Sequence, residues 1–314
     1  MNVQDIIDLI HPHQGLLAYF CIVALGYALQ KFGFITNALT MFLSKSLVRV
    51  LYPCLIFHSI TSQYSRSSLL TSWPLPLAAF CLLFLGFTLG KGFIKTQGPM
   101  SATDRGTFRF MTVMPNYIFV PLPICAALWG DKGVASLIFS TLGAELGMWL
   151  LAVPQVRPHV SALRGLLTPP LFALTAALIV VALDTPLWAK ELLSYNETFG
   201  GIGQGAVPVS VALRGCHFGE TQLPFRSSRH WSLLSYRLIL IPICTLIILK
   251  FVELPSLHEK IIFLVSTMPP AVASVIISEM FGGNPKLAAE QVMIAHLFAL
   301  VTVPLWLYYG LNLL

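Results

Sequence analysis

The chain has 314 residues, of which 56% are hydrophobic and 10% are charged, and its mean hydropathy is +0.78. A water-soluble domain carries roughly a quarter charged residues, because it must cover itself with solvated groups. The composition therefore argues against a soluble globular protein. The net charge of +6 does not indicate a nucleic-acid partner, because the basic residues are spread singly between apolar runs.

Apolar runs long enough to cross a membrane recur along the whole chain. A helix of about twenty apolar residues spans the roughly 30 Å of hydrocarbon in a bilayer. With Gly, Pro and charged residues as breaks, the runs predict an all-α polytopic fold of ten transmembrane helices. The expected spans are 14–32, 38–61, 69–94, 105–129, 132–154, 163–184, 188–216, 229–251, 257–281 and 287–312. We expect the first span to be retained, because no basic residue precedes Lys31 as in a cleaved signal peptide.

The basic residues also predict a topology. Short cytoplasmic loops are enriched in Lys and Arg. Of the nineteen basic residues, eleven fall in one set of alternate loops and five in the other. This distribution places the 155–165 linker inside and both termini on the non-cytoplasmic side. We expect a multi-pass protein of the cytoplasmic (inner) cell membrane, since the short linker is typical of a compact bacterial protein.

Two halves of the chain share landmarks at nearly one offset. Met114 and Met268 are 154 residues apart, each followed by proline, and Pro53 and Pro208 are 155 apart. Two similar halves with an odd number of spans each must have opposite orientations. We therefore predict two inverted five-helix repeats, 1–155 and 156–314, which together form one transporter domain.

Two of the predicted spans carry prolines near their centres, at Pro115-Asn116 and at Pro269-Pro270. Proline removes a backbone donor, which hydrocarbon cannot replace, so such breaks are tolerated where protein or water surrounds them. In inverted-repeat transporters, opposed broken helices present N-termini with free N–H groups that suit an anion. A carboxylate is the natural substrate class. The alternative is that these prolines only kink packed helices.

Three ionisable residues in apolar segments are candidates for ion or proton coupling. Glu145 lies in the fifth predicted span, where a carboxyl group removed from water can exchange a proton during a transport cycle. The alternative is a structural hydrogen bond to Ser140 or Thr141. His296 lies in the tenth span and is either a proton carrier or a satisfied core histidine. Glu279 follows the ninth-span break by nearly three turns.

Other charged or glycine-rich features have structural interpretations. We expect snorkelling or charge balance within the helix bundle for the basic residues inside spans, which are Lys45, Arg49 and Arg237. The GGIGQG run at 200–205 lacks the strand and the spacing of a dinucleotide site and indicates close helix packing. His11 and His13 have no third ligand nearby, so we expect neither a metal site nor a cofactor.

Several motifs resemble those of the auxin efflux carrier family. NYIFVPLPI at 116–124 is similar to that family's Asn-x-Gly-Phe-x-Gly-x-Pro, although Ile118 and Pro121 replace the glycines. GQGAVPVSVALRG at 203–215 matches the family's Pro-containing seventh span. MPPAVASVIISEMFGG at 268–283 and LVTVPLWLY at 300–308 are similar to its ninth and tenth spans, with Ala273 in place of a frequent Asn.

The resemblance covers nearly the full chain and implies ten spans in scaffold and transport bundles, with the fourth and ninth helices crossing at their breaks. It also implies secondary active transport, with efflux as the expected direction, of a small organic anion such as auxin or a dicarboxylate. The expected substrate-binding residues are Pro115, Asn116, Tyr117, Pro269, Pro270 and Ala271. The expected partners are this anion and the lipid bilayer, with a proton or sodium ion and a second copy of the chain as further candidates.

Three other functions stay open. A sodium-coupled organic anion symporter of the bile acid symporter type shares the ten-span inverted design and would need oxygen ligands such as Ser274, Glu279 and Gln291. An intramembrane enzyme would need a convergent nucleophile, an acid–base pair or a metal set, and the scattered His and Glu residues do not predict one. A receptor or scaffold could keep the fold and bind a ligand without transport.

Overall fold

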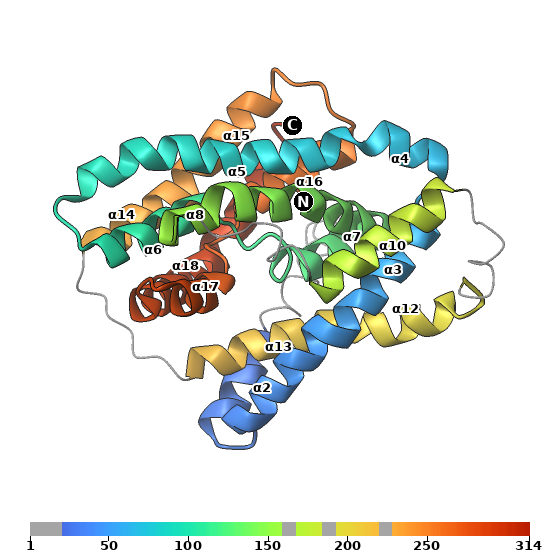
Figure 1. The fold of residues 1–314 in the computed structure, drawn as a ribbon, viewed down its shortest axis with the longest axis horizontal. Coiled ribbons are helices and arrows are strands. Elements are labelled where there is room, and N and C mark those ends of the chain that lie inside the picture. Colours follow the sequence, from blue (N-terminus) through green and yellow to red (C-terminus); the bar gives the residue numbers. More distant parts are fainter. Residues whose placement is uncertain (1–20, 159–167, 184–192, 220–227) are drawn as a thin grey trace, which may run out of the picture. The chain divides into compact units, whose positions relative to one another are not determined.

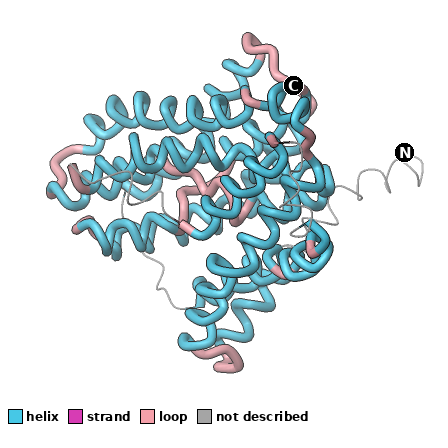
Figure 2. The backbone as a smooth tube through the Cα atoms, turned by 45° about the vertical axis from the view of Figure 1, so that its right-hand side comes forward, coloured by secondary structure: helices cyan, strands magenta, loops and turns pink. Residues whose placement is uncertain are grey.

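The computed structural model describes residues 21–158, 168–183, 193–219 and 228–314. These parts of the chain are helical and joined by short loops, as the sequence predicts (Figure 2). The one β-type pairing among them is an isolated antiparallel bridge between Pro115 and Pro270. His11, His13, most of the 155–165 linker and parts of the first, sixth and seventh predicted spans lie outside the described residues.

The chain divides into two compact units. Unit 1 comprises 1–73, 118–139 and 167–220, and unit 2 comprises 74–117, 140–166 and 221–314. These units differ from the predicted repeats, 1–155 and 156–314, which concern sequence similarity rather than packing and stay a prediction. The described helices of unit 1 are Cys21–Lys31, α2 (Asn37–Ser46), η1 (Leu47–Leu51), α3 (Tyr52–Gln63), α4 (Arg66–Ser72), α10 (Pro169–Ala182), α12 (Asn196–Gln204) and α13 (Ala206–Gly219).

Unit 2 holds most of the remaining helices. These are α5 (Pro74–Phe93), η2 (Ile94–Gln97), α6 (Ala102–Val113), η3 (Met148–Ala152), α8 (Val153–Val156), α14 (Ser228–Ser235), η4 (Tyr236–Leu240), α15 (Ile241–Leu249), α16 (Ser256–Ser266), α17 (Ala273–Phe281) and α18 (Pro285–Gly310). Helix α7 (Pro121–Gly147) begins in unit 1 and ends in unit 2. It bends at Gly130, whose φ of 56° is accessible to glycine at little cost, so the expected break at 130–133 is present as a kink.

In unit 1, α3 packs against α10 and α12 (Figure 1). Helix α12 approaches α3 closely at Gly203, since a Cβ added there would come within 2.6 Å of the Leu55 backbone. His58 on α3 lies 2.9 Å from the Asn196 carbonyl oxygen through its Nδ1. The GGIGQG run is thus a site of close helix packing, in agreement with its structural interpretation.

In unit 2, α5 lies beside α6, and α6 lies beside α8 and α18 (Figure 1). Gly86 permits the first contact, since a Cβ there would come within 2.7 Å of the Thr112 carbonyl oxygen. The Gly86 carbonyl accepts a hydrogen bond of 2.8 Å from the Tyr236 hydroxyl. Small residues therefore bring α5 close to its neighbours, and a buried hydroxyl fixes η4 against it.

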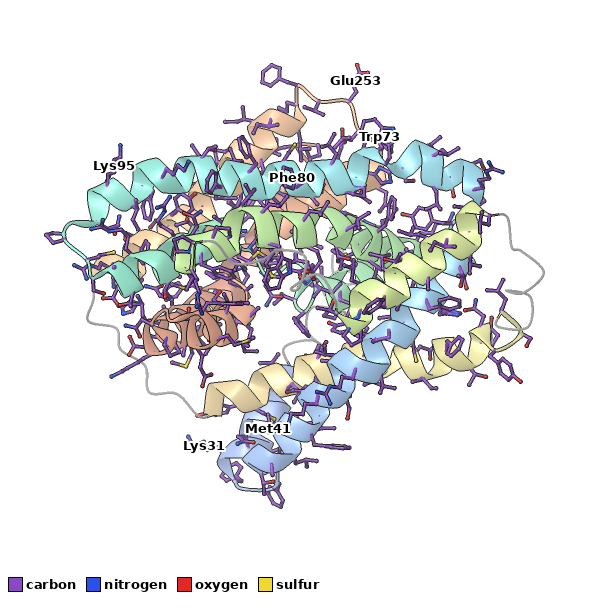
Figure 3. All side chains as sticks on the ribbon, in the orientation of Figure 1. Lys31, Met41, Trp73, Phe80, Lys95 and Glu253 are labelled. Carbon is purple, nitrogen blue, oxygen red and sulfur yellow. The ribbon has the colours of Figure 1, made fainter. Side chains whose placement is uncertain are left out.

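Five described helices are long and apolar enough to cross a membrane. They are Ala38–Gln63, Arg66–Gln97, Pro121–Val156, Arg229–Leu249 and Pro285–Gly310, with two shorter apolar helices at Cys21–Lys31 and Pro169–Ala182. Large apolar side chains such as Leu77 and Phe84 on α5 and Ile243 and Ile247 on α15 are exposed, which suits a lipid environment. In Figure 3 the Lys95 side chain lies at the end of the apolar helix that carries Phe80. The count of ten spans stays a prediction.

Three π-helical stretches precede prolines in long helices. Stretches η1, η3 and η4 each end two residues before a proline, at Pro53, Pro154 and Pro242 respectively. Proline lacks an N–H and its ring clashes with the carbonyl four residues back, and a wider turn relieves this clash. The prolines thus predict local distortions that bend these helices without ending them.

Candidate functional site

The first interruption separates α6 from α7. Helix α6 ends at Val113, and Met114 is extended, with φ −98° and ψ 103°. The residue before a proline is disfavoured in the helical conformation, so Pro115 ends α6 at this point. The chain stays non-helical until Pro121, and Met114, Pro115 and Asn116 are buried.

The second interruption separates α16 from α17. Helix α16 ends at Ser266, and its last turn tightens, with the Met268 N–H bonded to the Val265 carbonyl. Pro269 and Pro270 supply no N–H to continue the helix, which resumes at Ala273. All residues from Thr267 to Ala271 are buried.

The two interruptions pair with each other in unit 2. The Asn116 N–H donates to the Pro269 carbonyl at 2.8 Å, and the Ala271 N–H donates to the Met114 carbonyl at 3.1 Å. The breaks therefore satisfy part of their own backbone, as buried polar groups must. These two N–H groups are engaged in the bridge. The expectation that backbone N–H groups of the breaks hold an anion stays a prediction for the remaining ones.

The Asn116 side chain joins the bridge to α18. Its Nδ2 lies 3.2 Å from His296 Nε2, and His296 Nδ1 lies 2.6 Å from the Val292 carbonyl oxygen. A carbonyl only accepts, so Nδ1 is the protonated nitrogen, and Nε2 accepts from the Asn116 amide. Asn116 and His296 are 2% and 3% exposed, so this contact belongs to the core of unit 2.

The next residue joins the bridge to α7. The Tyr117 hydroxyl donates to Glu145 Oε1 at 2.6 Å. The other carboxyl oxygen of Glu145, Oε2, is buried and has no hydrogen-bond partner among the described residues. Glu145 is therefore held by Tyr117 rather than by Ser140 or Thr141, and half of its carboxyl group is left for another partner.

Most of the predicted site residues thus form one connected cluster in unit 2. We call this cluster the bridge site, and it consists of Met114, Pro115, Asn116, Tyr117, Glu145, Met268, Pro269, Pro270, Ala271 and His296. Glu279 does not join it, because its side chain is exposed on α17. The spacing of the prolines predicted the backbone positions, and burial in an apolar segment predicted Glu145 and His296.

Arg237 contacts the bridge site and was missed as a site residue. Its side chain is fully buried at 0% exposure, and its Nε donates to the Met268 carbonyl at 3.3 Å. Snorkelling is therefore the wrong interpretation for Arg237, whereas the exposed side chains of Lys45 and Arg49 agree with it. A lone arginine inside the run YRLILIPICTLIIL was the signal that could have identified it.

The three expected sodium ligands do not share a hydrogen bond. The Ser274 hydroxyl donates to the Ala271 carbonyl at 2.5 Å, and Gln291 Nε2 donates to His230 Nδ1 at 2.6 Å. The Gln291 Oε1 atom is buried and has no hydrogen-bond partner among the residues that the structure describes, and Glu279 is exposed. In the described parts of the chain, no group of three or more His, Cys, Asp or Glu side chains is placed to hold a metal ion.

Comparisons with known proteins agree with this architecture. A model of the membrane transport protein family, of the auxin efflux carrier type, matches residues 14–154 and again residues 155–307. The chain belongs to this family. A relative from Methanocaldococcus jannaschii, named an uncharacterized transporter, is 23% identical over 96% of this chain and 99% of its own length. The uncharacterized transporter YfdV of Escherichia coli K12 is 22% identical over 93% of this chain and 96% of its own.

A third relative, an uncharacterized transporter of Methanothermobacter thermautotrophicus, is 25% identical over 93% of this chain and 96% of its own length. None of these three names states a substrate. The family and these relatives establish that the chain is a multi-pass membrane transporter. The resemblance drawn from the sequence motifs is therefore confirmed at the level of the family.

Proposed function

We propose that this transporter is a secondary active carrier that exports a small organic anion, such as a carboxylate, by alternating access at the bridge site. The observation that carries the proposal is the pairing of two interrupted helices in the interior of unit 2, at Pro115 and Pro270. Interrupted helices at membrane depth are tolerated where they line a site, and transporters commonly bind substrate there.

The side chains around the bridge support a polar substrate. Asn116 and Tyr117 supply an amide and a hydroxyl, and Glu145 and His296 supply two ionisable groups. Polar groups are expensive inside a bilayer, so a cluster of four around two helix breaks favours a functional role over a purely structural one. In this proposal Asn116 donates a hydrogen bond to the anion, and the prolines keep the breaks open.

We also propose that the halves 1–155 and 156–314 are inverted repeats of ten spans in total. In this topology both termini lie on the non-cytoplasmic side of the cytoplasmic membrane. The two matches of the family model, which meet between residues 154 and 155, support the repeat. The excess of basic residues in one set of loops supports the orientation.

Proton coupling belongs to the same proposal, with Glu145 as the first candidate carrier and His296 and Glu279 after it. The Glu145 carboxyl supports it, because Tyr117 holds only one of its two oxygens. Sodium coupling of the bile acid symporter type is the second candidate. The buried Gln291 Oε1 favours it, because this oxygen accepts no hydrogen bond within the described ranges. Replacing sodium by choline separates the two candidates, since only a sodium-coupled carrier stops.

An uptake assay in proteoliposomes tests the function. The assay compares benzoate, succinate and indole-3-acetate in the parent, in Asn116→Ala and in Asn312→Ala. Asn312 is the matched control, because its amide lies at an exposed position near the chain end and bonds only the Tyr308 carbonyl among the described residues. We expect Asn116→Ala to lower transport about tenfold or more, as for a lost hydrogen bond to a charged group, and Asn312→Ala to leave it unchanged.

Other results would contradict this function. Unchanged transport by Asn116→Ala removes Asn116 from the site. Parent protein that transports none of the three carboxylates overturns the proposed substrate class. Binding of a carboxylate in detergent without flux in proteoliposomes identifies a receptor instead of a carrier.

A further inference from the structure

Arg237 lies in the π-helical stretch η4, inside the apolar helix Arg229–Leu249. It is the largest fully buried side chain of the described residues. A π-helical turn frequently marks a functional position, because it redirects side chains from the regular helix surface. The guanidinium therefore lies in the protein interior, just before the run LILIPICTLIIL at 238–249, which is apolar except for Thr245.

The hydrogen bonds of this guanidinium are far from complete. It has five N–H groups, and its Nε donates to the Met268 carbonyl at 3.3 Å. Both Nη1 and Nη2 are buried, and neither has a hydrogen-bond partner within the described parts of the chain. No acidic side chain in the described residues lies within ion-pair distance of it, since the one ion pair there joins His230 to Glu290. Burying a cation without a counter-charge costs free energy, so Nη1 and Nη2 indicate an anionic partner.

Capping of a broken helix explains only part of this arrangement. The break at Pro269-Pro270 leaves the Met268 carbonyl without the helical partner that an unbroken helix would supply, and Arg237 Nε provides one. A neutral donor would serve this purpose equally well. Capping therefore accounts for Nε but gives no role to the positive charge or to the two Nη atoms.

The position of Arg237 connects it to the bridge site. Met268 precedes Pro269, whose carbonyl accepts the N–H of Asn116. The guanidinium thus contacts the residue next to the bridge, on the side of the second break. A planar guanidinium presents two parallel N–H groups that match the two oxygens of a carboxylate.

We propose that Arg237 binds the carboxylate group of the transported anion through Nη1 and Nη2. This inference rests on the proposed function, in which an organic anion is carried at the bridge site. The positive charge comes from a side chain on η4, and Nε stays on Met268 to hold the guanidinium in place.

Transport kinetics in proteoliposomes test this inference. The parent, Arg237→Gln, Arg237→Lys and Arg49→Gln are compared with benzoate as substrate and benzamide as its neutral isostere. We expect Arg237→Gln to raise the KM for benzoate about tenfold or more and to lose the preference for benzoate over benzamide. Arg237→Lys keeps the positive charge but lacks the two parallel N–H groups, so its KM for benzoate should lie between those of the parent and Arg237→Gln. Arg49 is the matched control, because it is an exposed arginine inside another apolar helix.

A direct binding measurement covers the case in which Arg237→Gln does not fold. Parent protein with ¹⁵N-labelled arginine is titrated with benzoate and with benzamide, and the Arg237 guanidinium signal is assigned by its loss in Arg237→Lys. A shift of this signal with benzoate alone supports the inference. A signal that benzoate does not move overturns it.

The two proposals fail in different ways. If the parent transports carboxylates and Arg237→Gln does so with an unchanged KM, Arg237 is only a helix cap, while the proposed function stands. If the parent transports no carboxylate, the proposed function is wrong and the role of Arg237 is wrong with it.

Discussion

The two interruptions in unit 2 bond to each other but differ in their side-chain chemistry. The first, after Val113, carries polar side chains, since Asn116 contacts His296 and Tyr117 contacts Glu145. The second, after Ser266, consists of Thr267, Met268 and two prolines followed by Ala271 and Val272. Its Thr267 hydroxyl donates back to the Leu264 carbonyl within its own helix.

The contacts of the second interruption therefore come from its backbone and from the side chain of Arg237. Its carbonyls accept from Asn116 and from Arg237, and its Ala271 N–H donates to Met114. An apolar break and a polar break can thus form one site, because each exposes main-chain groups that the other satisfies. Changes at the first break should act through side chains, and changes at the second should act through the backbone.

Removing a backbone donor from the second break should have the largest effect. Ala271→Pro eliminates the N–H that bonds the Met114 carbonyl and leaves that buried oxygen unsatisfied. We expect the free energy of unfolding to fall by roughly 1–3 kcal/mol and transport to be lost. Thermal unfolding in detergent and benzoate uptake measure the two effects. Ala271→Ser keeps the N–H and is the control, and equal melting of the two variants would contradict the role of the bridge.

At the first break, Tyr117→Phe removes the donor to Glu145 without changing the backbone. We expect transport to fall about tenfold, because the carboxyl loses its hydrogen bond to Tyr117 and such a bond is worth roughly 1–3 kcal/mol. Glu145→Gln is the matched variant, since its amide oxygen can still accept from Tyr117 while the ionisable group is gone. The number of protons moved per benzoate, followed with a pH-sensitive dye, distinguishes Tyr117→Phe from Glu145→Gln. Only Glu145→Gln should abolish proton coupling. Full coupling in Glu145→Gln would exclude Glu145 as the proton carrier.

A smaller effect is expected at His296. His296→Leu deletes the acceptor for Asn116 but leaves the backbone bridge intact. Loss of one neutral hydrogen bond should lower the free energy of unfolding by about 1 kcal/mol, with a severalfold decrease in benzoate uptake. Chemical denaturation in detergent and initial uptake rates give the two values. A decrease as large as that of Ala271→Pro would show that the side chain of Asn116, rather than the bridge, holds the breaks together.

The smallest effect is expected at Glu279. Its side chain is exposed on α17 and makes no hydrogen bond to the bridge site among the described residues. Glu279→Gln should change uptake less than twofold, because an exposed charge contributes little to a buried site. Initial rates over a range of pH provide the comparison with Glu145→Gln. A large loss of coupling would instead place Glu279 on the ion pathway.

Much of the backbone of the site could be predicted because proline acts locally. A proline such as Pro115 or the Pro269-Pro270 pair interrupts its helix by its own chemistry. Each break follows a methionine, Met114 or Met268, and the offset of 154 residues between them suggested that the breaks belong together. The choice of Asn116 and Tyr117 as site residues followed from their position beside the break. Their partners on α7 and α18 depend on packing between distant segments, which a single sequence does not specify.

The sequence left two interpretations of Arg237 open, snorkelling and a position inside the helix bundle, for a physical reason. A basic residue inside an apolar run can either extend to the membrane surface or turn into the protein, and both choices suit the same local sequence. The π-helical stretch before Pro242 and the approach of Met268 decide between them. Both depend on how the helices of unit 2 pack.

Hydropathy and proline chemistry act over a few residues, so the helical membrane fold, the family and the places where helices break could be read from the amino-acid sequence. The folded protein was needed to show that the two breaks bond to each other, that Tyr117 holds Glu145, and that a buried guanidinium lies beside Met268. These contacts join residues from 28 to 157 positions apart, and such pairs form only when packing brings their helices together.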